Sequence, residues 1–251
     1  MKRKLAALLL AASAAVAAAA YTGGGQSLPQ APSAKPRTAS NLILLDPAHG
    51  GPDSGANLGG TLREKDVTLG FAAKLRSSLA NANFNVTSTR DADPSVVLTT
   101  DQRAETANRL RPLACLILHA TASGSGVHIY TSALPAAPDA GPDGTTDAPL
   151  VPWESAQAGS VEQSRKLAST FSSALTSAGV PVIESSAAVP PLDNMMCPAV
   201  AVEVAPASGS AVGDSEYQRR IIGALTSGLL TWQTHLVQPA SPPTSGPRSR
   251  P

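Results

Sequence analysis

The sequence predicts an α/β fold: a single domain built on a mostly parallel, twisted sheet with helices on both faces. Short continuous apolar runs, for example residues 42–45 and 113–118, are typical of strands that are buried on both sides. Between these runs lie segments in which apolar residues recur about every four positions, as in amphipathic helices. Strands that alternate with helices along a chain favour a parallel sheet covered on both faces.

The expected strands, in chain order, are residues 42–45, 85–89, 113–118, 126–130, 180–183 and 199–204. The expected helices are residues 65–81, 99–110, 160–179 and a last one that begins at 214 or 215 and continues to about 236. Thr99 with Gln102, and Ser160 with Gln163, have the spacing of capping boxes, which begin helices. Pro112 and Gly179 are expected to end the second and third helices.

The segments outside these elements suggest the domain organisation. Residues 1–20 begin with three positive charges and continue as an apolar stretch that ends in small residues, the pattern of a signal peptide; an uncleaved membrane anchor is the alternative. Residues 21–40 and 239–251 are rich in Gly, Pro and Ser without periodicity, so we expect a flexible linker and a disordered tail. The domain is then residues 41–238, with an irregular loop at 133–159, and it is expected in the periplasm or outside the cell.

Charge and cysteine content narrow the partners and the redox state. The net charge of +1 gives no support for a nucleic-acid partner held by charge. Cys115 and Cys197 could form a disulfide in an oxidising compartment, or remain free, since free cysteine is often buried. The two alternatives are nearly balanced, and we favour free cysteines by a small margin.

Four side chains are candidates for chemistry. His49, His119 and Glu203 each lie at, or just past, the carboxyl end of an apolar strand, and parallel strands bring such ends to one edge, where ligands bind. Two imidazoles and a carboxylate gathered there fit a zinc site. Glu64 begins the first helix, which returns from the same edge. Singly these residues prove little: most lone histidines in loops have no special role, and a helix dipole favours a carboxylate at its N-terminus.

Six blocks of the sequence become informative when they are taken together and in order. They read DPAHGGPDSGA, REKDVTLGFAAKL, TSTRDAD, RAETAN, ILHA and PAVAVEV. This ordered set resembles the zinc-dependent N-acetylmuramoyl-L-alanine amidases of the amidase type 3 family and covers nearly all of the domain. In the resemblance, His49 and His119 match the family's zinc histidines, Glu64 matches its zinc glutamate, and Glu203 matches its catalytic glutamate.

The resemblance implies a hydrolase with one zinc ion per chain, bound by His49, Glu64 and His119, and with Glu203 moving protons. The substrate would be peptidoglycan, cleaved at the amide bond between N-acetylmuramic acid and the L-alanine of the stem peptide. We expect a monomer, and a protein activator could be needed. Two alternatives stay open: a catalytically inactive cell-wall-binding module on the same fold, and a zinc carboxypeptidase, which would need a cation for a terminal carboxylate.

The sequence also departs from the family pattern close to these positions. Ala48 replaces a usual glycine, Thr121 replaces a usual amide after His119, and Ala205-Pro206 stands where Gly-Phe is usual. These changes bear on rate and substrate preference more than on metal binding. Some members carry a regulatory helix over the site; residues 133–159 are too rich in Pro and Gly for such a helix, so we expect an uncovered site.

Other polar residues near the motifs are expected to have lesser roles. Asp46 is a candidate for orienting a ligand histidine from behind. His128 is expected to face solvent or the groove, with substrate contact as the less favoured interpretation, and His235 to cap the last helix or face solvent. Loops are expected to be held by hydrogen bonds from Arg90, Arg103 and Asn108. The groove is expected to be bordered by Asp193 and Asn194.

Overall fold

The computed structural model describes residues 41–137, 152–207 and 209–237, which belong to one compact unit. The expected signal peptide and linker, residues 1–40, and the expected tail, residues 239–251, lie outside the described residues. The same holds for residues 138–151 of the expected irregular loop. The end of that loop is described and forms a short 3-10 helix, η1 (Trp153–Gly159).

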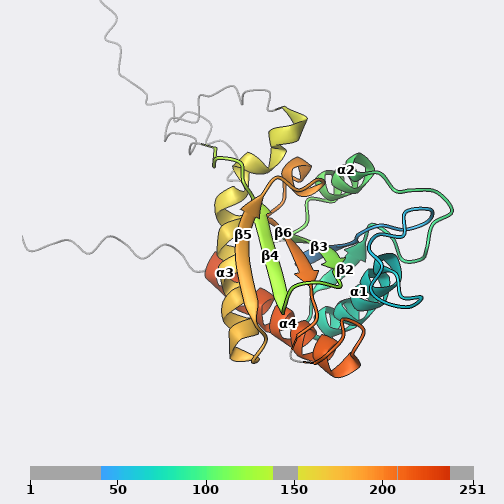
Figure 1. Ribbon diagram of the computed structural model, residues 1–251. Helices are drawn as coiled ribbons and strands as arrows, with labels where there is room; N and C mark the ends of the chain where they lie inside the picture. Colours follow the sequence, from blue (N-terminus) through green and yellow to red (C-terminus); the bar gives the residue numbers. More distant parts are fainter. Residues whose placement is uncertain (1–40, 138–151, 208, 238–251) are drawn as a thin grey trace, which may run out of the picture. The chain divides into compact units, whose positions relative to one another are not determined.

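Within the described residues, six strands form one sheet in the spatial order β2, β1, β3, β6, β4, β5 (Figure 1). Their bounds are β1 (Leu42–Pro47), β2 (Asn85–Ser88), β3 (Ala114–Ala120), β4 (Val127–Ser132), β5 (Val182–Ala187) and β6 (Ala199–Val204). All neighbours pair in parallel except β4 and β6, which are antiparallel. The mostly parallel α/β sheet expected from the sequence is therefore confirmed.

The helices of the described chain are α1 (Glu64–Asn81), α2 (Thr100–Leu110), α3 (Val161–Ser177), α4 (Ser215–Val237) and a second 3-10 helix, η2 (Leu192–Asn194). The capping box of Thr99 and Gln102 is confirmed at the start of α2. The prediction of a capping box at Ser160 is wrong. The helix η1 ends directly before Ser160, and the Ser160 hydroxyl donates to the carbonyl of Met196 instead. None of the helices in these ranges is both long and apolar enough to span a membrane.

Helices pack on both faces of the sheet, as expected. On the first face, α1, α3 and α4 bury alternate strand residues in the larger core. Side chains from β1, β3 and β6 supply this core, among them Ile43, Leu45, Leu116, Leu118, Val200 and Val202. On the second face, residues of α2 and the η2 segment cover the intervening strand positions. That smaller core contains Leu44, Ala104, Ala107, Cys115, Ile117, Leu192, Met195, Cys197, Ala199 and Ala201.

A disulfide joins Cys115 of β3 to Cys197, just before β6. This corrects the small preference for free cysteines. The two residues are 82 positions apart in the sequence, and only the packing of the η2 segment against the second face brings their Cα atoms to 6.2 Å. That separation lies in the normal range for a disulfide.

On the second face, α2 and the η2 segment do not extend over the carboxyl ends of β3 and β6. Beyond Ile117 and Ala201, the next side chains on that face are His119 and Glu203, which are partners in the register of the two strands. Glu203 is in turn the partner of His128 in the antiparallel pair of β6 with β4. The fold thus leaves a row of three titratable side chains at one edge of the sheet.

Replacing both cysteines with serine is expected to lower the free energy of unfolding by about 2–4 kcal/mol, because the bond closes a long loop in the unfolded chain. Urea unfolding of the wild type, the Cys115→Ser/Cys197→Ser variant and the wild type under reducing conditions measures the effect. Reduced wild type should match the variant. Equal stability of all three samples would contradict a stabilising disulfide.

Candidate metal centre and active site

His49 lies in a tight turn directly after β1. The turn begins with a backbone hydrogen bond of 3.0 Å from Ala48 N to Leu118 O, which ties it to β3. His49 itself has a positive φ of 62°, and Gly50 and Gly51 follow with φ of 131° and 63°. A positive φ is uncommon for a residue with a side chain. The turn is braced by Arg103 of α2, whose Nη2 donates to the carbonyl oxygen of His49 at 2.8 Å.

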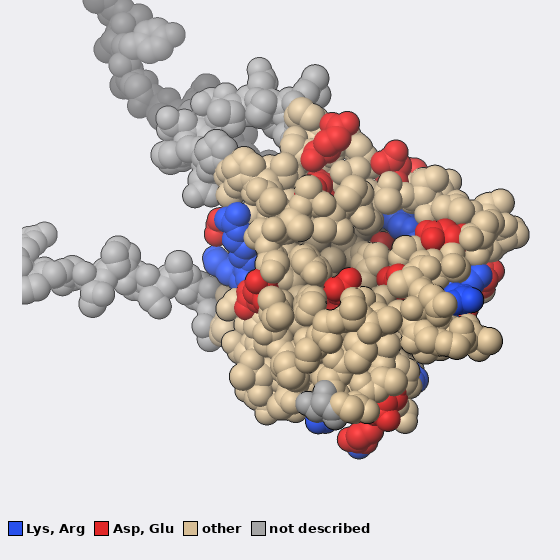
Figure 2. Space-filling model, in the orientation of Figure 1, with Lys and Arg blue, Asp and Glu red and all other residues tan. Residues whose placement is uncertain are grey.

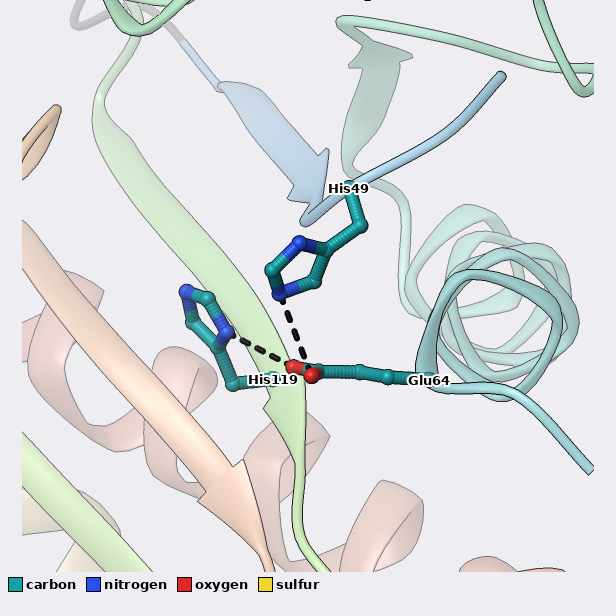
Figure 3. Close-up of side chains that lie close together, drawn as sticks. All are labelled: His49, Glu64 and His119. Atoms are coloured by element: carbon teal, nitrogen blue, oxygen red, sulfur yellow. Dashed lines mark hydrogen bonds and ion pairs between the residues drawn. The ribbon is translucent and has the colours of Figure 1, made fainter. Parts of the chain in front are cut away.

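Glu64, the first residue of α1, places its carboxylate between the two candidate histidines (Figure 3). Oε2 lies 3.1 Å from Nε2 of His49, and Oε1 lies 2.8 Å from Nδ1 of His119. Backbone N–H groups complete the set: Ala56 donates to Oε2 at 2.9 Å and Ala120 donates to Oε1 at 3.2 Å. Glu64 as a whole residue is only 5% exposed, so its carboxylate is stabilised by these partners rather than by water.

These contacts shift the pKa values of the cluster. Burial acts to raise the pKa of Glu64, but the hydrogen bonds with His119 and His49 and from the two backbone N–H groups outweigh it, so the pKa lies far below its usual range. The pKa of His49 is raised, chiefly by its hydrogen bond to Glu64; burial opposes the shift and Asp53 adds to it. These contacts hold the Glu64 carboxyl in its charged form, which is the form that can bind a cation.

The donor set fits a metal ion. One ligand atom from each of His49, Glu64 and His119 lies within 4.8 Å of the others. Around a tetrahedral zinc ion with bonds of about 2.0–2.2 Å, ligand atoms are about 3.3 Å apart. The separations of 3.1 Å from His49 to Oε2 and 2.8 Å from His119 to Oε1 are shorter than that spacing, so the side chains would move apart to admit the ion. The His49 and His119 rings lie nearly perpendicular, with centroids 5.4 Å apart, and both remain partly open to solvent.

Asp53 is the residue that orients the candidate ligand His49, and sequence reasoning missed it. Its Oδ2 lies 2.8 Å from Nδ1 of His49, which holds the imidazole with Nε2 toward Glu64. The expectation for Asp46 is wrong: its Oδ1 accepts hydrogen bonds from Arg103 and Thr89 rather than from a histidine. Asp46 lies within β1 and points into the buried face, whereas the turn after Gly50 brings Asp53 back to His49.

The other expected residues hold the surrounding loops, mostly as predicted. Arg90 donates to the carbonyls of Pro47, Ala48 and Lys65, and Asn108 bonds to the backbone of Asn194 and Met196. Asp193 accepts a hydrogen bond from the hydroxyl of Ser132 and, like Asn194, is buried. The groove is bordered instead by the neighbouring Pro190 and Pro191. His235 is exposed near the end of α4.

A cavity of about 190 Å³ adjoins the histidines. Its lining includes His49, Asp53, Val97, Ile117, His119 and Pro191. The face seen in Figure 2 is hollowed, with acidic side chains and basic atoms at the edge of the hollow. Glu203 lies next to His119 across the β3–β6 pair, and its side chain is 29% exposed. The site thus combines a cluster that could hold a metal ion, a nearby carboxylate and an adjoining cavity.

Gly55 leaves the space in which His49 and Glu64 meet. A Cβ atom at this position would lie 2.6 Å from Cδ2 of His49 and 2.7 Å from Oε2 of Glu64, closer than real contacts allow. The Gly55→Ala variant is therefore expected to bind its metal at least about tenfold more weakly, because a metal site depends on its supporting geometry. Metal titration followed by calorimetry measures the loss.

Gly60→Ala is the matched control. Gly60 belongs to the same loop and has a φ of 55°, against 63° for Gly55, but no atom lies within 4 Å of an added Cβ. Both variants carry a similar backbone cost, so only Gly55→Ala should lose metal affinity. Equal affinities in the two variants would show that the close approach at Gly55 does not matter.

The chain is similar in sequence and in fold to known proteins. The sequence pattern of the family described as N-acetylmuramoyl-L-alanine amidase (Amidase_3) matches residues 43–231. The germination-specific N-acetylmuramoyl-L-alanine amidase of Bacillus subtilis is 38% identical over 99 residues, which are 39% of this chain and 41% of that protein. The chain thus spans about two fifths of the length of this curated relative.

Two solved structures share the fold at low identity. An N-acetylmuramoyl-L-alanine amidase from Clostridium difficile 630 is similar with a TM-score of 0.60 at 20% identity, over 78% of this chain and 98% of that one. The CwlD amidase from Clostridioides difficile, in complex with the GerS lipoprotein, has a TM-score of 0.56 at 20% identity, over 77% and 98% of the two chains. With its family pattern matched over residues 43–231, the chain belongs to the amidase type 3 family of N-acetylmuramoyl-L-alanine amidases.

Proposed function

We propose that this protein is a zinc-dependent peptidoglycan hydrolase that cleaves the amide bond between N-acetylmuramic acid and the L-alanine of the stem peptide. The observation that carries the proposal is the cluster of His49, Glu64 and His119, with ligand atoms within 4.8 Å of one another, inside the region matched by the family. A carboxylate, Glu203, stands beside this cluster on the next strand. These are the parts that metal-assisted amide hydrolysis requires.

His49, Glu64 and His119 would hold the ion, one per chain. Two nitrogen ligands and one oxygen ligand suit zinc, although the same donors can bind other divalent ions. When bound, zinc would lower the pKa of water toward neutrality and polarise the scissile carbonyl. Asp53 supports this arrangement by accepting the Nδ1 proton of His49, so that the other nitrogen offers its lone pair.

Glu203 would act as the general base and then as the general acid. It is the register partner of His119 but does not belong to the cluster of ligand atoms, so its carboxylate stays available for proton transfer. It would take a proton from the attacking water and give it to the leaving amine of L-alanine. A positioned carboxylate in this role contributes typically about 10²–10⁴-fold to the rate.

The chain's setting supports a cell-wall substrate. We infer that residues 1–20 are a signal peptide and residues 21–40 a linker, which would deliver the domain to the periplasm or the outside of the cell. The Cys115–Cys197 disulfide agrees with an oxidising compartment. The structurally similar CwlD amidase forms a complex with a lipoprotein, and an activating protein could act on this chain as well. Otherwise we expect the chain to work as a monomer that binds no nucleic acid.

The surroundings of the site favour an amidase over a carboxypeptidase. Among the described residues that line the cavity beside His49, Arg103 is the only lysine or arginine. Its guanidinium group already donates to Asp46 and to the carbonyls of Leu98, Pro47 and His49. A substrate's terminal carboxylate would therefore find no free cation there, whereas an internal amide needs none.

Glu203→Gln is expected to retain about one zinc ion per chain and to lose at least about a hundredfold in turnover, because the amide is not a base. Glu64→Gln is the contrasting variant: it removes a charged ligand and should lose the metal as well as activity. Metal analysis, together with mass spectrometry of products released from purified peptidoglycan, checks both.

The products separate the alternatives. Stem peptides that begin with L-alanine, released by the wild type alone, are the expected result. Loss of zinc from Glu203→Gln would make Glu203 a ligand. Shortened stem peptides still attached to glycan would indicate a carboxypeptidase. Zinc-loaded wild type that binds peptidoglycan but releases nothing would indicate a binding module.

A further inference from the structure

We propose that His128 and Tyr130 are positioning residues, which hold one oxygen of the Glu203 carboxylate so that the other oxygen remains free to exchange protons. The inference rests on the proposed role of Glu203 and adds two residues of β4 to it. Neither residue belongs to the metal cluster.

The register of the sheet places these side chains together. His128 is the direct partner of Glu203 in the antiparallel β4–β6 pair, and Tyr130 is the partner of Ala201, two residues away on the same face. Directly opposed residues in such a pair have Cβ atoms about 4.5–5.5 Å apart, within reach of each other's side chains. The proximity follows from strand pairing, so it does not depend on a loop.

Both contacts converge on one oxygen of Glu203. Nδ1 of His128 lies 3.3 Å from Oε1, and the hydroxyl of Tyr130 donates to the same Oε1 at 3.5 Å. The hydroxyl also lies 3.5 Å from Nδ1 of His128, which closes a triangle of polar atoms. No described residue forms a hydrogen bond with Oε2. These distances are long, and such contacts of catalytic groups commonly tighten only when substrate is bound.

The imidazole of His128 is held in place from behind. Gly124, in the loop between β3 and β4, passes so close that a Cβ there would lie 3.1 Å from Cε1 of His128. Nε2 of His128 is buried and has no hydrogen-bond partner in the described part of the chain. The ring therefore has one polar contact surface, its Nδ1 edge, and that edge faces Glu203. A role in direct substrate binding through Nε2 is excluded by this burial.

Tyr130 is suited to act as a permanent donor. Burial raises the pKa of its hydroxyl, and the negative charge of Glu203 raises it further, so the hydroxyl keeps its proton at neutral pH. Since Nδ1 of His128 faces a carboxylate, the tautomer with its proton on Nδ1 is the one that this arrangement stabilises. Two donors from alternate positions on the same face of one strand then fix the direction of the Glu203 carboxylate.

The test compares His128→Leu with His128→Asn in the full, zinc-loaded protein. Leucine fills part of the space without a donor, whereas the amide nitrogen of asparagine can occupy nearly the place of Nδ1. His128→Leu should lower kcat at least about tenfold for release of L-alanine peptides from a soluble muramyl peptide, because misplacing a catalytic group by about 1 Å is costly. KM and zinc content should stay within about twofold of wild type, as expected when binding and metal are untouched.

Rescue and non-additivity distinguish positioning from packing. His128→Asn should recover most of the lost kcat, and Tyr130→Phe should show a smaller loss than His128→Leu. In a Glu203→Gln background, His128→Leu should cause no further loss, since residues that act as a unit are not additive. His235→Leu, at an exposed position of α4, is the control for loss of a histidine.

Several results would overturn the inference. Wild-type kcat in His128→Leu would do so, as would equal losses in the leucine and asparagine variants. A fall of zinc content or of Tm in parallel with kcat would assign His128 a packing role instead. A wild type that releases no stem peptides, or a Glu203→Gln variant with full activity, would instead reject the proposed function on which the inference rests.

Discussion

The burial of one charge, the carboxylate of Glu64, sets the architecture of the site. A buried carboxylate is costly unless hydrogen-bond donors surround it. Here the polar partners come from three separate places: the loop before α1, through Ala56 N–H; the end of β3, through Ala120 N–H and His119; and the turn after β1, through His49. The start of α1 adds its favourable dipole. Satisfying this charge therefore requires the three segments to meet, and their meeting creates the pair of imidazoles beside a carboxylate that a metal ion can use.

The second face of the sheet connects the core with this site. Over the first part of β3 and β6, the face is covered by α2 and the η2 segment, with the Cys115–Cys197 bond holding that cover to the sheet. Side chains alternate between the two faces along β3 and β6, so His119 and Glu203 lie on the same face as the buried Ile117 and Ala201. Because the covering helices end before them, His119 and Glu203 remain partly exposed. Arg103 spans the boundary: it extends from α2, pairs with the buried Asp46 and supports the carbonyl of His49. Packing of the apolar core thus fixes the turn that carries His49, a candidate metal ligand.

Sequence patterns predicted the elements well, because apolar periodicity and turn residues are local properties. All six strands and four α-helices were expected within a few residues of where they lie. The capping box at Thr99 was readable for the same reason, since its two partners are three residues apart. The box at Ser160 failed because a distant carbonyl, that of Met196, competed for the hydroxyl. The candidate role of Asp46 failed similarly, and Asp53 was missed, because their distances to His49 depend on how the turn folds back.

What the sequence by itself determined is the α/β fold and the positions of the four candidate site residues at strand and helix ends, since hydrophobic patterning and topology suffice for both. The tertiary structure decided which atoms meet. It brought Cys115 to Cys197, Asp53 to His49, and His128 with Tyr130 to Glu203. The physical reason is that these contacts depend on strand register and on the path of loops. A shift of one residue in register would turn every side chain of a strand to the opposite face, and no local pattern records that choice.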